Sequence, residues 1–228
     1  MKMRSMGKTV VWGDSVARGV IYDERRARYM ISKQAAARSV SDAIGTEVVL
    51  RAHMGMTAVQ GAALMEKDLE KGMVAEAALL GFGGNDSDFD WRAISADPTA
   101  DHQPKTPLAT YEADVREMIS MAQGAGMRVT LCTLPPIMSE RYFDFFSGEE
   151  LNRENILAWL GDKNKIYRFH ERYSLLLGRL AREYSCRLID LRAAFLEKWD
   201  VRPYYCRDGI HPNAEGQRLL GESILAAI

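Results

Sequence analysis

The chain has 228 residues, of which 47% are hydrophobic and 27% are charged. These proportions are those of an ordinary globular protein and argue against disorder, and the length fits one large domain or two small ones. The 30 basic and 31 acidic residues give a net charge of −1, which disfavours nucleic acid as the main partner, and no apolar run approaches the ~18 residues of a membrane span.

The cysteines and the N-terminal residues indicate a reducing compartment. Cys132 and Cys186 lie in or beside apolar runs, and no cysteine belongs to a C-x-x-C pair, so buried free thiols are expected. The N-terminal residues are basic but lack the apolar stretch of a secretory signal. We therefore expect a soluble, cytoplasmic protein.

Strands and helices alternate along the first half of the chain. Buried strands are predicted where apolar runs are bounded by turn residues, at 8–12, 47–52 and 75–82. Helices are predicted at 32–44 and at 58–71, the second after an N-cap at Thr57. The charge-dense segment 22–29 predicts a solvated loop.

The second half continues this alternation and adds two insertions. Further strands are predicted at 127–134 and 186–191, and further helices at 110–125, 166–184, 193–199 and 213–228. Residues 86–109 contain three prolines and no clear period, and such long irregular stretches are often functional. Residues 137–165 are rich in aromatic and charged side chains and predict one or two short helices. We treat both as insertions into a single domain spanning 1–228.

This order of elements predicts the fold class. Strands that alternate with helices form an α/β domain with a parallel sheet. Five strands suit a flavodoxin-like, three-layer α/β/α sandwich with strand order 2-1-3-4-5. Ligands of such sheets lie beyond the carboxyl ends of the strands, so residues at those ends are the candidates for function.

Chemically versatile residues follow three of the predicted strands. Ser15 follows the first strand, Asn85 follows the third, and Asp208 and His211 lie in the loop beyond the fifth. Each has a structural explanation on its own, as a helix cap, a turn residue or a surface hydrogen bond. Together they supply a nucleophile, an amide donor, a base and an orienting carboxylate on one edge of the sheet.

The chemistry of acyl transfer explains this combination. A serine hydroxyl such as that of Ser15 becomes a nucleophile when a base removes its proton, and the imidazole of His211 can serve. Asp208, three residues earlier, can hold the other imidazole nitrogen. The oxyanion that forms needs donors, which Asn85, the Ser15 N–H and the N–H of Gly55 can provide.

These segments resemble the SGNH (GDSL) hydrolase superfamily. The sequence VVWGDS at 10–15 is similar to the first block of that family, with Ser15 as nucleophile. G-x-N-D at 83–86 is similar to the third block, with Asn85 as an oxyanion donor, and D-x-x-H at 208–211, which continues as HPN, is similar to the fifth. The resemblance implies a flavodoxin-like fold and hydrolysis of esters or thioesters through an acyl-enzyme, with no cofactor and no metal.

The second block departs from the family pattern. The segment LRAHMGMTAVQG at 50–61 lacks the usual asparagine, so Gly55 is either an oxyanion donor or only a turn glycine. Asp14, His53 and Trp91 lie next to the blocks and are further candidates for substrate binding. For the last two, a structural role is the more expected one.

The sequence therefore predicts a serine ester hydrolase whose partner is a small-molecule ester with a small or medium acyl group. An O-acetylated carbohydrate is suggested by the family resemblance alone. A thioesterase, a lysophospholipase or an acyltransferase would use the same residues. The aromatic insertion at 137–165 is expected to form either a satellite core or a lid that favours short acyl groups.

Two non-enzymatic alternatives remain at this point. A binding module could keep the pocket without doing chemistry, although it would have no need of Ser15, Asn85, Asp208 and His211 together. A flavodoxin-like flavin or nucleotide binder should carry a phosphate loop after the first strand, where this chain has Asp14 instead.

Overall fold

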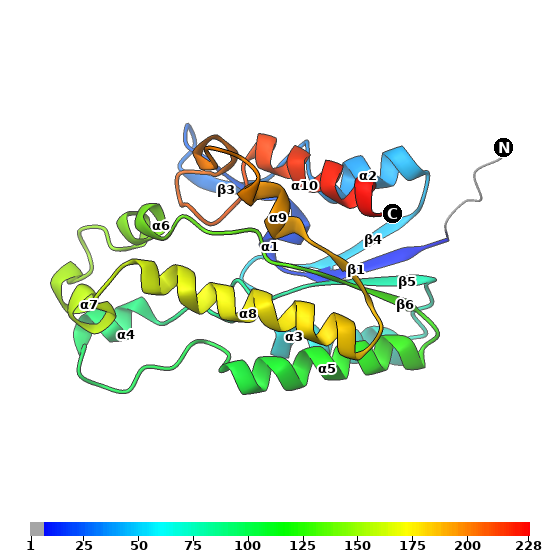
Figure 1. The fold of residues 1–228 in the computed structure, drawn as a ribbon, viewed down its shortest axis with the longest axis horizontal. Coiled ribbons are helices and arrows are strands. Elements are labelled where there is room, and N and C mark those ends of the chain that lie inside the picture. The colour runs from blue at the N-terminus through cyan, green and yellow to red at the C-terminus, as the bar shows by residue number, and fades with distance from the viewer. Residues whose placement is uncertain (1–6) are drawn as a thin grey trace.

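A five-stranded parallel sheet forms the centre of the computed structural model, which describes residues 7–228 (Figure 1). The strands lie in the order β4-β1-β5-β6-β7, and every neighbouring pair is parallel. Their bounds are Thr9–Gly13 for β1, Val48–Ala52 for β4, Ala77–Gly81 for β5, Arg128–Cys132 for β6 and Arg187–Ile189 for β7. In chain order this arrangement is 2-1-3-4-5, so the predicted topology is confirmed.

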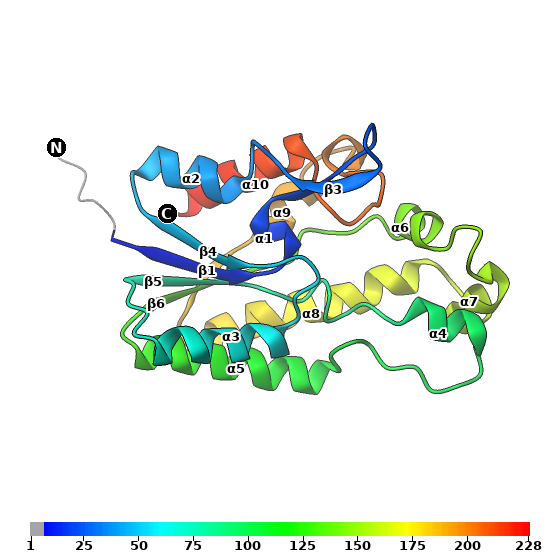
Figure 2. The ribbon, with the colours of Figure 1, turned by 180° about the vertical axis from the view of Figure 1, so that it is seen from behind.

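Helices cover both faces of the sheet (Figures 1 and 2). One face carries α3 (Ala58–Glu70), α5 (Leu108–Gly124) and α8 (Asn164–Glu183), and the other carries α2 (Ala36–Ile44), α9 (Leu191–Leu196) and α10 (Ala214–Ala227). Alternate side chains of a strand point to opposite faces. Val10 and Trp12 accordingly belong to the larger core under α3, α5 and α8, whereas Leu79 packs in the smaller core with α9 and α10.

The two insertions pack on each other beyond the carboxyl edge of the sheet. The first contains α4 (Trp91–Ala96), and the second forms α6 (Ser139–Phe146) and α7 (Arg153–Leu160). Their side chains share a third apolar cluster, built by Phe89, Trp91, Ile94, Phe143, Ile156, Leu160 and Ile166. The aromatic residues of 137–165 therefore contribute to a satellite core, which is one of the two arrangements expected for that segment.

The predicted solvated loop at 22–29 is wrong. Strands β2 (Val20–Asp23) and β3 (Arg28–Ile31) form an antiparallel hairpin, in which Tyr22 pairs with Tyr29. The charged residues that suggested a loop lie at its exposed tip, 24–28, whereas the two tyrosines are half-buried and their rings lie 5.1 Å apart. Cross-strand aromatic pairs of this kind stabilise a short hairpin.

The boundaries of several elements also differ from the prediction. Helix α5 begins at Leu108 after Pro107, two residues before the expected Thr110. The N-cap of α3 at Thr57 is confirmed, and Gln60 completes a capping box. Residues 202–204 form a short 3₁₀ helix, η1 (Arg202–Tyr204), within the expected loop.

Two further expectations concern the thiols and the membrane. Cys132 and Cys206 are buried, Cys186 is half-buried, and all three are free. Among the helices of the described chain, none combines the length and apolarity that a membrane crossing requires.

Candidate active site

Ser15 is fixed by the tight connection between β1 and α1 (Ser15–Arg18). Asp14 caps this short helix, because its Oδ1 accepts a hydrogen bond of 2.9 Å from the N–H of Val16. A Cβ on Gly13 would lie 2.7 Å from the Cβ of Ala17, so only glycine allows the helix to turn back so closely over the strand. Ser15 is thereby held, 5% exposed, at the carboxyl edge of the sheet.

Hydrogen bonds within the loop that carries Asp208 and His211 fix its conformation. Asp208 Oδ1 accepts hydrogen bonds from the N–H groups of Ile210 and His211 at 3.1 and 3.0 Å. Between them, Gly209 has a φ of +74°, which favours glycine. Its carbonyl accepts a hydrogen bond of 2.8 Å from the N–H of Met138. The beginning of the second insertion therefore supports the loop from outside.

Three polar side chains meet at this edge in one hydrogen-bonded chain. His211 Nε2 lies 2.8 Å from Ser15 Oγ, and His211 Nδ1 lies 2.6 Å from Asp208 Oδ2. A proton on Nδ1 is then donated to the carboxylate, which leaves Nε2 to accept the serine proton. Burial by itself would raise the pKa of Asp208, but the hydrogen bonds and the charge of His211 outweigh it and hold that pKa below its usual value.

Asn85 lies beside this chain and is tied to the loop that follows β4. Its Nδ2 donates a hydrogen bond of 3.1 Å to the carbonyl of Met56, and Asp86 Oδ1 accepts one of 2.8 Å from the N–H of Ala58. Gly55 lies in the same loop with a φ of +78°, inside a turn closed by the N–H of Met56. An amide nitrogen carries two hydrogens, so one N–H of Asn85 is not used by the Met56 contact.

Residues 11–219 match the GDSL-like Lipase/Acylhydrolase family. The chain belongs to this family. Among curated proteins, the GDSL esterase/lipase CPRD49 of Arabidopsis thaliana is 22% identical over 186 residues, which cover 80% of this chain and 66% of the plant protein. Lipases and acylhydrolases cleave acyl esters, so the chain is an ester hydrolase.

Solved structures of low sequence identity share the fold. The lipase/acylhydrolase from Enterococcus faecalis is 21% identical, with a TM-score of 0.67 over 97% of this chain and 94% of that one. A mutant of an acetyl-xylooligosaccharide esterase from Geobacillus stearothermophilus is 19% identical, with a TM-score of 0.68 over 100% of this chain and 96% of that one. These similarities agree with the flavodoxin-like α/β/α architecture of this GDSL-family chain.

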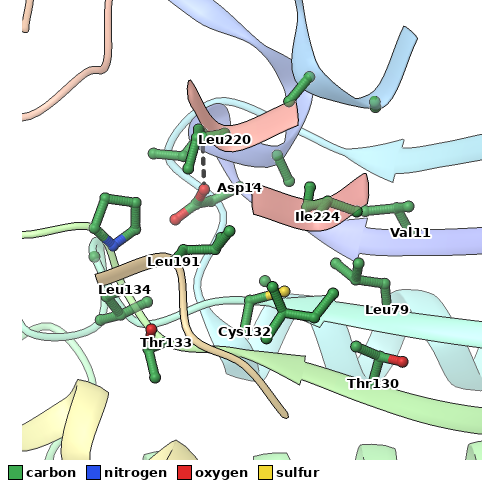
Figure 3. A pocket seen from close by; sticks show the side chains of 18 of the residues that line it. Val11, Asp14, Leu79, Thr130, Cys132, Thr133, Leu134, Leu191, Leu220 and Ile224 are labelled. Atoms are coloured by element: carbon green, nitrogen blue, oxygen red, sulfur yellow. Dashed lines mark hydrogen bonds between the residues drawn. The ribbon is translucent and has the colours of Figure 1, made fainter. Parts of the chain in front are cut away.

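A cavity of about 760 Å³ opens beside Ser15. Of the predicted site residues, Ser15, Asn85, His211, Asp14 and Trp91 line it. Below this mouth, the cavity continues between the sheet and the helices of the α10 face (Figure 3). This deeper part is lined by Val11, Leu79 and Cys132 from the strands and by Leu191, Leu220 and Ile224 from the helices.

Asp208, Gly55 and His53 lie around the cavity without lining it, whereas Trp91 lines it from a buried position. Asp208 is fully buried behind His211. Gly55 and His53 lie in an exposed turn, tied to β1 by a hydrogen bond of 3.1 Å from the His53 N–H to the carbonyl of Gly13. Trp91 is only 7% exposed, because its ring stacks on Phe146 at a centroid distance of 4.5 Å. Within residues 7–228, no three His, Cys, Asp or Glu side chains gather as a metal ion would require.

The prediction from sequence missed Tyr29, whereas Tyr142 belongs to the insertion that was expected to form a satellite core or a lid. The ring of Tyr29, on the unpredicted hairpin, lies 5.1 Å from the imidazole of His211. Tyr142 of α6 lines the cavity, and its hydroxyl donates a hydrogen bond of 2.9 Å to Asp88. A signal for the hairpin exists, since two short runs rich in Val, Ile and Tyr flank the polar tip.

Two carboxyl groups close to Ser15 are buried, and the pKa of each is raised. Burial raises the pKa of Asp14 to about 6, despite the hydrogen bond from Val16 and the proximity of His211. Burial also raises the pKa of Asp86 to about 6, against the hydrogen bond from Ala58. Each group therefore takes up a proton more readily in the folded protein than in the unfolded chain.

We expect Asp14→Asn to stabilise the protein at pH 8 but not at pH 4. The folded-state pKa of about 6 exceeds the ordinary value of 3.8, so the wild type loses stability as the pH rises through that interval. A shift of this size corresponds to at most about 3 kcal/mol, and asparagine keeps the helix cap. Urea denaturation at the two pH values measures the difference.

The exposed helix cap Asp90 provides the control for this prediction. Asp90→Asn makes the same exchange at an exposed helix cap and measures the effect of losing a cap carboxylate without burial. A stabilisation by Asp14→Asn that is the same at both pH values would contradict the burial argument.

Proposed function

We propose that the chain hydrolyses esters of small or medium acyl groups through an acyl-enzyme on Ser15. The observation that carries this proposal is the hydrogen-bonded chain from Asp208 through His211 to Ser15 Oγ. It lies in the mouth of a cavity, beside the side-chain amide of Asn85. Membership of the GDSL-like lipase/acylhydrolase family supports the reaction class.

The proposed reaction has two halves. In the first, His211 Nε2 takes the proton of Ser15 Oγ as this oxygen attacks the ester carbonyl carbon. The tetrahedral intermediate then collapses, its bond to the alcohol oxygen breaks, and His211 gives the proton to the leaving alcohol. In the second half, His211 takes a proton from water as the water oxygen attacks the acyl carbon. The bond from that carbon to Ser15 Oγ then breaks, His211 returns the proton to Oγ, and the acid is released. Asp208 holds the imidazole and stabilises its charged form throughout.

Three N–H donors are proposed for the oxyanion. Ser15 is the first residue of α1, where a backbone N–H has no partner within the helix. The second N–H of the Asn85 amide and the backbone N–H of Gly55 complete the set. Their rigidity is supported by the contact of Asn85 with Met56, because preorganised donors need no reorganisation when the charge develops.

Labelling with a fluorophosphonate distinguishes this function from that of a module that binds a ligand without catalysing a reaction. Such a probe phosphonylates a serine only when a neighbouring base activates it. We expect one adduct on Ser15 of the wild type and none on Ser15→Ala or His211→Ala. A wild type that resists the probe and hydrolyses no nitrophenyl ester would refute the proposal.

The cavity supports acyl groups longer than acetyl. Its deeper part is lined by apolar side chains such as Leu79 and Ile224, and its volume of about 760 Å³ is within the range of small-molecule sites. An acetyl group would leave most of this apolar surface uncovered, whereas a longer acyl chain would bury it and gain free energy of binding. The expectation of a preference for short acyl groups depended on the insertion at 137–165 alone, whereas the apolar lining of the cavity favours the opposite order.

For nitrophenyl esters, kcat/KM should rise from acetyl to octanoyl. Each buried methylene contributes up to about 0.8 kcal/mol, or roughly fourfold. Ile224→Phe, which places a larger side chain in the cavity, should flatten the series. The neighbouring Leu225 does not line the cavity, so Leu225→Phe is the matched control and should leave the series unchanged. A wild type for which acetyl esters are the best substrates would contradict this assignment of the acyl site.

An O-acetylated carbohydrate is the second candidate substrate. It is favoured by the similarity to the acetyl-xylooligosaccharide esterase and to an acetyl xylan esterase with a TM-score of 0.63. In that case acetyl esters should be fastest in the same series, and acetylated xylo-oligosaccharides should outrun nitrophenyl acetate in kcat/KM. Acyl-thioesters and acceptor alcohols added to the same assay distinguish thioesterase and acyltransferase activity.

A further inference from the structure

The β2–β3 hairpin lies against the loop that carries Asp208 and His211. Both ribbon views show the hairpin beside this orange loop (Figures 1 and 2). The N–H of Tyr22 lies 3.2 Å from Cys206 Sγ, and the ring of Tyr22 packs edge-on against Phe145 of α6 at 5.4 Å. The hairpin is thus anchored on one side to the catalytic loop and on the other to the second insertion.

Tyr29 brings this hairpin into contact with the proposed base. Its ring lies 5.1 Å from the imidazole of His211, tilted by 58°. Burial and the nearby charge of Asp208 raise the pKa of Tyr29, so its hydroxyl keeps its proton beside the carboxylate. Asp208 holds His211 through Oδ2 and its charge also acts on Tyr29, whose ring contacts His211, so one tyrosine is linked to both members of the pair.

We propose that Tyr29 is a positioning residue for the His211–Asp208 pair, and that the β2–β3 hairpin is part of the active site. The inference depends on the proposed esterase function for its kinetic test only. The tilted ring, 5.1 Å from the imidazole, limits the motion of His211. The hydroxyl neutralises part of the charge on Asp208, which controls how tightly the imidazole holds a proton.

Few other ionisable groups face this pair. Asp14 lies close enough to His211 for their charges to interact. On the side of Tyr29, the neighbouring groups are Tyr22 and Cys206, and Tyr142 of α6 interacts with Tyr29. Burial raises the pKa of the Cys206 thiol to about 11. Among these groups, Asp14 is the carboxyl whose pKa is raised to about 6. Asp14 is present in the wild type and in every hairpin variant, so a difference between their pH profiles does not come from its removal.

Tyr29→Phe tests the proposal because it keeps the ring and removes only the hydroxyl. Without that donor, the full charge of Asp208 acts on the imidazolium, which then holds its proton to higher pH. We expect the acid limb of the kcat/KM profile to move up by roughly 0.5 to 1 pH unit. The loss of this polar group beside Asp208 should lower kcat roughly two- to tenfold, with KM little changed.

Tyr22→Phe is the matched control, since Tyr22 is the cross-strand partner of Tyr29. This variant should keep the wild-type pH profile. Tyr29→Ala, which also removes the ring, should lower kcat further than Tyr29→Phe. A Tyr29→Phe protein with the pH profile and kcat of the wild type would overturn the proposal, and so would an equal shift in Tyr22→Phe.

A second measurement separates this inference from the proposed function. The imidazole C–H resonances of His211 can be titrated by NMR in the Ser15→Ala protein, where no turnover is needed, and His211→Ala identifies them among the four histidines. Adding Tyr29→Phe should move the titration midpoint up by the same interval as the kinetic limb. An unmoved midpoint overturns the inference, whereas a moved midpoint in a protein without esterase activity refutes only the proposed function.

Discussion

Ser15→Ala is expected to lower ester turnover by on the order of a million-fold while leaving the fold intact. The change removes the nucleophilic oxygen, which lies 2.8 Å from His211 Nε2, and it leaves nothing for that base to activate. The fold should persist because the cap of α1 is provided by Asp14 and not by Ser15. Turnover of a nitrophenyl ester and a thermal melt measure the two expectations.

Ser87 supplies the control for this loss of turnover. It is also 5% exposed, lines the same cavity, and donates a hydrogen bond of 3.1 Å to the carbonyl of Gly84. Ser87→Ala should therefore reproduce the effect of losing a buried hydroxyl at this edge without a comparable loss of activity. Near wild-type turnover by a folded Ser15→Ala protein would eliminate the acyl-enzyme mechanism.

Asn85→Ala should lower kcat by roughly a hundred- to a thousandfold, the usual effect of removing one oxyanion donor. KM should change much less, because the donor is needed mainly when charge develops in the transition state. Steady-state kinetics with one ester give both constants. A steep rise in KM at unchanged kcat would identify Asn85 as a ground-state binding residue and contradict its assignment as a donor.

Asn85 also holds the loop after β4 through Met56, so the prediction needs a control for loop motion. Gln60 accepts a hydrogen bond of 3.0 Å from the N–H of Thr57 in the same loop and is exposed. Gln60→Ala should loosen this loop while keeping the Asn85 amide. We expect it to leave kcat nearly unchanged, which separates the loss of a donor from a displaced turn.

Local pattern and strand topology were sufficient to predict the sheet and the residues gathered at its edge. Short apolar runs separated by amphipathic segments indicate parallel strands, and parallel strands place their carboxyl ends on one side. Ser15, Asn85 and His211 each follow such an end in the sequence, so their proximity could be expected before any distance was known. The order 2-1-3-4-5 followed from the same reasoning.

The tertiary structure decided what surrounds these residues. The hairpin was hidden because its charged tip dominates segment 22–29, whereas the burial of Tyr29 results from contact with His211 in the last part of the chain. The deep part of the cavity depends on how α10 packs over β1, β5 and β6. Local sequence determines which segment becomes a strand or helix, but the spaces and contacts between distant segments depend on side-chain packing. For that reason the polar residues at the strand ends were predictable, whereas the aromatic wall and the acyl cavity around them were not.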